Sequence, residues 1–205
     1  MSNLFGNISG DPRMQRQALI SRFSAARVNL LLMIIFTAIN LLTLTTGIGS
    51  YFLFSATVPY LITDIGMALC GMYPQEYYEG LEGMIFLDKS FFVILLILSL
   101  LILVIYLLCW IFSKKNRVGF LIGALAMFSF DTLVLLMSGE ILTTIVDIII
   151  HIWVIVILSM GISANYKLKQ LPKEEVYIEG EFRELPADDN EAGAIEPKDE
   201  SSEEF

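Results

Sequence analysis

The sequence has 205 residues, of which 56% are hydrophobic and only 17% charged, and its formal net charge is −9. This composition excludes an ordinary soluble domain, because the apolar residues come in long runs rather than in alternating patterns. The charge pattern excludes nucleic acid as a partner, because no basic face with interleaved aromatic side chains lies outside the apolar runs.

Four apolar runs are long enough to cross about 30 Å of hydrocarbon as helices. They cover residues 28–46, 91–112, 118–137 and 141–163. The sequence therefore predicts an all-α membrane protein in which residues 28–171 form a four-transmembrane-helix bundle, with the lipid bilayer as its first partner.

Residues 1–27 are rich in arginine and lie before the first run. Asp11-Pro12 is typical of a helix start, because Asp caps free N–H groups and Pro fits the first helical position. The segment is interpreted as a cytoplasmic, basic, amphipathic helix. It either lies on the membrane surface or serves only as a positive flank that sets orientation.

Lys and Arg gather on one side of the predicted bundle. They occur before the first run, at Lys114, Lys115 and Arg117, and after the fourth run, whereas the connection 47–90 carries only Lys89. By the positive-inside rule, both termini are expected in the cytoplasm and the connection outside, in a multi-pass protein of the plasma or cytoplasmic membrane.

The outer connection, residues 47–90, contains a second kind of apolar segment. Residues 51–70 are as apolar as a span but carry Pro59 and Asp64. A full crossing would make a fifth span and move the acids that follow to the cytoplasm, so a re-entrant or interfacial element is expected. Tyrosines 73, 77 and 78 suit an interfacial belt, with ligand binding as the alternative.

The excess of negative charge lies in residues 172–205, which contain thirteen acidic and three basic residues from Lys173 onward. This composition predicts a largely disordered, acidic cytoplasmic tail. Val176–Leu185 is loosely alternating and is a possible docking strand for a cytoplasmic protein. Gly119 and Gly123 form a small-residue ridge that suits helix packing, either within the bundle or in a homo-oligomer.

Ionisable residues inside the apolar runs are the strongest functional signal, because a charge there needs a partner, water or a neutral form. Asp131 stands seven residues before Ser138, and Asp147 seven after Glu140, so both are expected about 10 Å below the outer surface. His151 lies one helical turn from Asp147. Asn40 of the first run is expected at the same depth.

Three interpretations of this layer remain open. The polar side chains hold the helices together; or they bind a cation, protons or a small polar ligand for a transport-related protein; or Asp131, Asp147 and His151 hold a divalent metal in an intramembrane enzyme. No cofactor is expected, with the metal as the alternative. The favoured function is a transport-related or accessory membrane protein with a site at Asn40, Asp131, Asp147 and His151, and the alternative is an accessory subunit that acts by protein–protein association.

Overall fold

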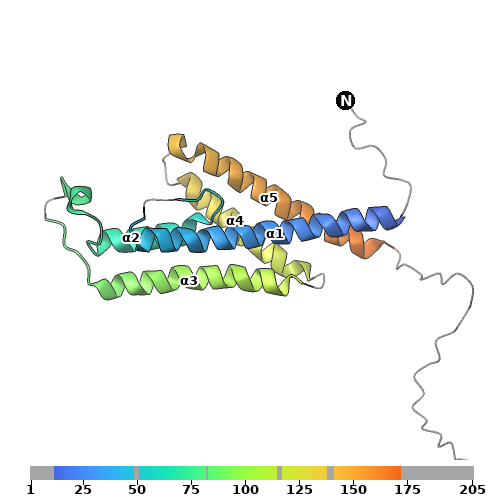
Figure 1. The fold of residues 1–205 in the computed structure, drawn as a ribbon, viewed down its shortest axis with the longest axis horizontal. Coiled ribbons are helices and arrows are strands. Elements are labelled where there is room, and N and C mark those ends of the chain that lie inside the picture. Colours follow the sequence, from blue (N-terminus) through green and yellow to red (C-terminus); the bar gives the residue numbers. More distant parts are fainter. Residues whose placement is uncertain (1–11, 49–50, 82, 115–116, 138–140, 172–205) are drawn as a thin grey trace, which may run out of the picture. The chain divides into compact units, whose positions relative to one another are not determined.

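The computed structural model describes residues 12–48, 51–81, 83–114, 117–137 and 141–171. These residues form five α-helices and one 3-10 helix, η1, and contain no β-strand (Figure 1). In chain order the elements are α1 (Pro12–Thr45), α2 (Thr57–Leu69), η1 (Gln75–Tyr78), α3 (Lys89–Phe112), α4 (Val118–Met137) and α5 (Ile141–Gln170). The predicted acidic tail and its segment Val176–Leu185 lie outside the described residues.

Four of these helices, α1, α3, α4 and α5, are long and apolar enough to cross a membrane. The prediction of a helical protein with four spanning helices is confirmed. The chain is therefore a multi-pass helical membrane protein. We call the end of the bundle that carries residues 46–88 the loop end, and the opposite end, where α1 begins and α5 ends, the terminal end.

The described part of the basic segment, residues 12–27, and the first predicted span form one helix, α1, of 34 residues. No Gly or Pro occurs between Arg13 and Thr45, so nothing in the local sequence ends the helix between them. Arg27 donates from Nε to the Ser113 hydroxyl at 2.9 Å and so links α1 to the end of α3. Residues 12–27 are thus the first part of α1.

α2 is too short to span a bilayer, because its 13 residues rise only about 20 Å. Pro59 is its third residue, in the first turn, where backbone N–H groups have no partner within the helix. Pro59 therefore starts this helix rather than interrupting it. α2 packs closely on α3. The Thr63 hydroxyl of α2 donates to Ser99 Oγ of α3 at 2.9 Å, and a Cβ added to Gly66 of α2 would lie 3.2 Å from the Leu95 side chain of α3.

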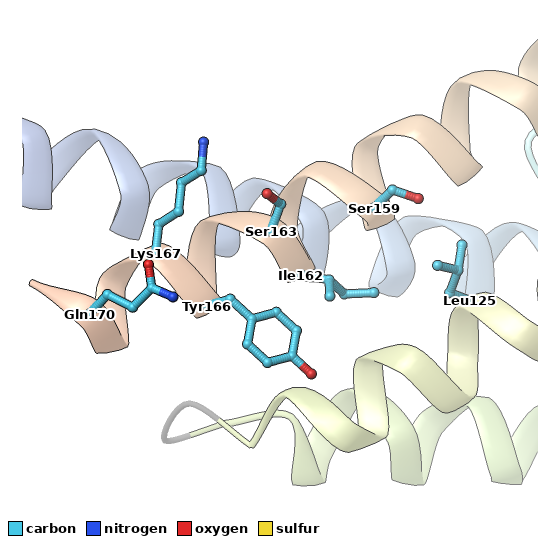
Figure 2. A pocket seen from close by; sticks show the side chains of 7 residues that line it. All are labelled: Leu125, Ser159, Ile162, Ser163, Tyr166, Lys167 and Gln170. Atoms are coloured by element: carbon cyan, nitrogen blue, oxygen red, sulfur yellow. The ribbon is translucent and has the colours of Figure 1, made fainter.

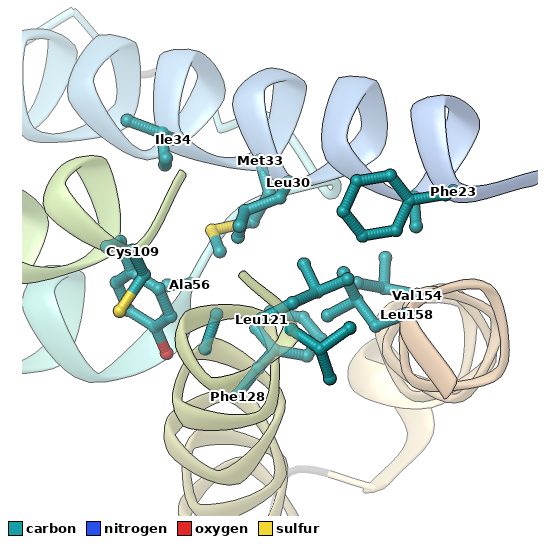
Figure 3. Packing of buried hydrophobic residues seen from close by; sticks show 14 residues of the cluster. Phe23, Leu30, Met33, Ile34, Ala56, Cys109, Leu121, Phe128, Val154 and Leu158 are labelled. Carbon is teal, nitrogen blue, oxygen red and sulfur yellow. The ribbon is translucent and has the colours of Figure 1, made fainter. Parts of the chain in front are cut away.

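The apolar core lies between α1, α4 and α5, with α3 against one side. Figure 3 shows Leu30 and Met33 of α1 beside Leu121 and Phe128 of α4 and Val154 and Leu158 of α5. These side chains are fully or almost fully buried. The core therefore fixes the three helices that carry most of the polar residues discussed below.

One glycine marks the closest approach of two spanning helices. A Cβ added to Gly161 of α5 would lie 2.3 Å from the Cβ of Ala26 in α1. The predicted Gly119 and Gly123 ridge is different, because a Cβ on Gly119 would meet nothing within 4 Å and one on Gly123 only Cys109 Sγ at 3.9 Å. Close packing within the chain therefore uses Gly161, and a role of Gly119 and Gly123 in a homo-oligomer stays a prediction.

Asp88 caps the start of α3 and gives the first test. Its carboxylate accepts from the Ser90 hydroxyl and from the Ser90 N–H at 2.8 Å, and these bonds hold the pKa of Asp88 below its ordinary value. A carboxylate with a lowered folded-state pKa stabilises the helix end at higher pH and loses this effect as the pH falls through that pKa. We expect amide protection at Ser90 and Phe91 to fall on acidification. In Asp88→Asn, which keeps a capping oxygen, the protection should be independent of pH; an equal acid response in both proteins would contradict this.

Candidate functional site

The segment between α1 and α2 is held by side chains of α1. Asn40 accepts the Phe52 N–H at 2.8 Å with Oδ1, and its Nδ2 donates to Phe52 O at 2.8 Å and to Ser55 Oγ at 2.7 Å. One turn earlier, the Thr37 hydroxyl accepts the Ala56 N–H at 2.8 Å. Both α1 side chains are completely buried. They pair the backbone of a non-helical segment that would otherwise leave polar groups unsatisfied.

Asp131 of α4 caps the start of α2. Its Oδ2 accepts the Thr57 N–H at 2.8 Å, and its Oδ1 accepts the Val58 N–H at 2.7 Å. The residue in the ordinary capping position is Ala56, whose side chain makes no cap. A carboxylate is the favourable partner at this place, because free N–H groups and the helix dipole make a helix N-terminus positive. Asp131 therefore supplies from another helix the cap that α2 lacks.

His151 of α5 lies on the other side of the same carboxylate. Its Nε2 is 3.3 Å from Asp131 Oδ2 and 3.4 Å from the Thr57 hydroxyl. The ring is fully buried and stacks on Phe128, with centroids 4.8 Å apart and planes inclined by 10°. His151 and the start of α2 thus share one oxygen of Asp131.

Asp147 lies one turn from His151 and faces the loop end. Its Oδ2 accepts the Tyr51 hydroxyl at 3.1 Å. Its Oδ1 is buried, has no hydrogen-bond partner among the described residues, and lies 4.0 Å from His151 Nδ1. We call Tyr51, Thr57, Asp131, Asp147 and His151 the polar cluster.

The positions of the hydrogens follow from the acceptors. His151 Nδ1 is 2.9 Å from the Asp147 carbonyl oxygen, which only accepts, so Nδ1 carries a hydrogen. A second hydrogen on Nε2 makes an imidazolium that donates to the Asp131 carboxylate. Without it, Nε2 presents a lone pair to that carboxylate, and only the Thr57 hydroxyl can donate to the ring. The bond between His151 and Asp131 therefore depends on one proton.

The structure brings Asp131, Asp147 and His151 together, as depth counting along the helices predicts. Asn40 lies in the same layer but bonds the segment at residues 52–55. Sequence reasoning missed Tyr51, Thr57 and the two α2 amides. Tyr51 follows the apolar run without any spacing signal, and backbone amides leave no mark on a sequence.

Two cavities lie at opposite ends of the bundle. One, of about 590 Å³ at the loop end, is lined by Tyr51, Tyr60 and Tyr73, among others, and so reaches the polar cluster through Tyr51. The other, of about 490 Å³, lies at the terminal end, where Figure 2 shows Lys167 and Gln170 of α5 and Leu125 of α4 around it. Its described lining holds no carboxylate or histidine. The acid–base groups are thus connected to the loop end.

Fold and site together define a multi-pass helical membrane protein with a buried carboxylate–imidazole cluster at the start of a short helix. The sequence matches no family model, and no similar curated protein or solved structure was found. The function is therefore argued from the cluster itself.

Proposed function

We propose that the chain is a proton-binding membrane protein of a transport-related kind, in which protonation of the polar cluster controls how firmly α2 is held. The loop end faces the outside and both termini face the cytoplasm. The distribution of Lys and Arg supports this orientation: the terminal end carries Arg13, Arg16, Lys114, Arg117 and Lys167, whereas residues 46–88 contain acids and no base.

In this proposal residues 51–69 are a re-entrant element. The start of α2 lies among buried polar side chains of α4 and α5, and the preceding Ala56 N–H bonds Thr37, about two turns before the end of α1. Its far end adjoins the start of α3, where the Leu87 N–H donates to Leu69 O at 2.9 Å. A helix that begins inside the bundle and ends beside the first residue of a spanning helix supports entry and exit on one side. Irregular backbone at this depth is tolerated because protein covers it.

The observation that carries the proposal is that Asp131 contacts both the start of α2 and the His151 ring. As a carboxylate it satisfies two amides of α2 and attracts an imidazolium, whereas a protonated Asp131 loses the charge that favours both contacts. The other titratable groups nearby are Asp147, Tyr51 and, in α3, Tyr106, which interacts electrostatically with Asp131. α1 contributes only the uncharged Asn40 and Thr37. Uptake of a proton from the outside therefore loosens α2.

Hydrogen exchange measured against pH tests this proposal. In the wild-type protein in nanodiscs, we expect the protection factors of the Thr57, Val58 and Tyr60 amides to fall on acidification. In Asp131→Asn they should be lower by about tenfold and independent of pH, because a hydrogen bond to a charged group contributes about 1.5–3 kcal/mol. His151→Gln should also change the pH response, because it removes the ring that shares Asp131 Oδ2 with the Thr57 amide.

Ser129→Ala is the matched control, because the Ser129 hydroxyl donates only within α4, to Leu125 O at 2.8 Å. It should behave as the wild type. Protection of α2 that does not change with pH in the wild-type protein would refute the proposal.

An accessory role is the second candidate, and one observation favours it: all four predicted site residues bond other residues of the same chain. In that case the polar cluster is purely structural, and a partner binds elsewhere. Deleting residues 172–205 would then abolish function, while Asp147→Asn and His151→Gln would leave it intact.

A metal-dependent enzyme is less well supported by the donor atoms. Both oxygens of Asp131 accept amides, and Nε2 of His151, the ring nitrogen that could bind a metal, lies 3.3 Å from Asp131 Oδ2. Within the described ranges, no group of three or more His, Cys, Asp and Glu side chains is arranged to hold a metal ion. This arrangement favours proton exchange over metal binding.

A further inference from the structure

The cavity at the loop end has an unusual concentration of tyrosine rings, and we call it the tyrosine pocket. Tyr51, Tyr60 and Tyr73 line it together with Met67, Met72 and Leu44, among others. The rings of Tyr51 and Tyr60 meet edge to face, with centroids 5.0 Å apart and planes inclined by 72°. The volume of about 590 Å³ is in the range of sites for small molecules.

Two of the three tyrosines donate their hydroxyl hydrogens to carboxylates. Tyr51 donates to Asp147 at 3.1 Å, and Tyr73 donates to Asp64 of α2. Burial and the bond to Asp64 raise the pKa of Tyr73, so its phenol stays protonated and neutral. Donation to an anion leaves more electron density on the ring. The negative faces of these rings are therefore strengthened by carboxylates placed behind them.

The charges around the pocket have one sign. Its described lining contains no Lys, Arg or His, and residues 46–88 carry five acids and no base. An anion would thus meet no cationic partner. A small metal cation would find few oxygen ligands, because the lining is mainly aromatic and aliphatic. A cation with an apolar body satisfies both features of the pocket.

We propose that the tyrosine pocket binds a small organic ammonium ion with an aromatic body. The ammonium group lies against the tyrosine faces, and the apolar body contacts Leu44, Met67 and Met72. The pocket touches the polar cluster only through Tyr51. The inference rests on the proposed function only for the side from which the cation arrives, which is the outside.

Binding of 2-phenylethylammonium, compared with its uncharged isostere 2-phenylethanol, tests the inference. Both are titrated by calorimetry into the full chain in nanodiscs. We expect the ammonium ion to bind at least about tenfold more tightly than the alcohol, since cation–π contacts contribute about 0.5–2 kcal/mol each. Equal affinities, or no saturable binding of the ammonium ion, would overturn the inference.

Ring-removing variants locate the site. Tyr60→Leu should weaken ammonium binding by about tenfold, whereas Tyr60→Phe, which keeps the ring, should change it by less than about threefold. Tyr166→Leu is the matched control, because Tyr166 is exposed at the terminal end of the bundle and does not line the pocket. An equal loss in the Tyr60→Leu and Tyr166→Leu variants would refute this location.

Asp131→Asn separates this inference from the proposed function. It should abolish the pH response of α2, while the variant still binds the ammonium ion more tightly than the alcohol, because Asp131 does not line the pocket and this preference comes from the tyrosine rings. A pH response without ammonium binding would refute the pocket alone. Ammonium binding without a pH response would refute the proton proposal alone.

Discussion

Asp131→Ala is expected to lower the free energy of unfolding by about 3–5 kcal/mol, because two amide hydrogen bonds to a carboxylate are lost, each worth about 1.5–3 kcal/mol. The variant leaves the Thr57 and Val58 amides without an acceptor and the His151 ring without its neighbour Asp131. Asp131→Asn should have a smaller effect, because its carboxamide oxygen still accepts one amide. Reversible unfolding in mixed micelles containing SDS measures both.

The control for this prediction is Ser129→Ala on the same helix, which should stay within about 0.5 kcal/mol of the wild type. If Asp131→Ala were as stable as this control, the carboxylate would not stabilise the fold, and α2 would be held by its packing on the neighbouring helices.

Gly161→Ala is expected to have the second largest effect, about 1–3 kcal/mol of destabilisation, although alanine is the better helix former. The new Cβ would lie 2.3 Å from that of Ala26, and a side chain this short cannot rotate away. α1 and α5 would have to move apart along their main contact. The same unfolding measurement reports the change.

Gly119→Ala provides a matched comparison, because its Cβ would meet nothing within 4 Å. It should be neutral or more stable by up to about 1 kcal/mol through helix propensity alone. Equal destabilisation of both variants would show that the Gly161 contact is not special. Destabilisation by Gly119→Ala alone, and only at high protein concentration, would favour a homo-oligomer through that face.

The sequence predicts the spanning helices well, because hydrocarbon demands long apolar runs and each run stands out from its flanks. The bounds of α4 agree with the prediction, while α1 and α5 extend beyond the apolar runs at the terminal end. Polar residues continue a helix there at no cost, since water is available to their side chains. Hydropathy alone therefore finds the span but not the end of the helix.

The candidate site was only partly predictable. Counting residues from the turn between α4 and α5 puts Asp131 and Asp147 at one depth and His151 one helical turn from Asp147, and the three side chains do lie together. The sequence alone does not show why a carboxylate is tolerated at residue 131. The main partners of Asp131 are backbone amides of α2, which lie 73 and 74 residues away in the chain. Pro59 was misleading as well, since a proline marks either the break or the first turn of a helix.

The unbroken α1 has a mechanical consequence. Its 34 residues make a rod about 50 Å long that carries Asn40 near one end and its arginines near the other. A continuous hydrogen-bond ladder bends only gently, so a rotation at one end is passed along the whole length. If the segment that Asn40 holds by hydrogen bonds shifts when α2 loosens, the arginine-rich end of α1 is displaced, while the helix between Asn40 and the arginines keeps its structure. A local change at the loop end can in this way displace the terminal end of the same helix, as with a lever.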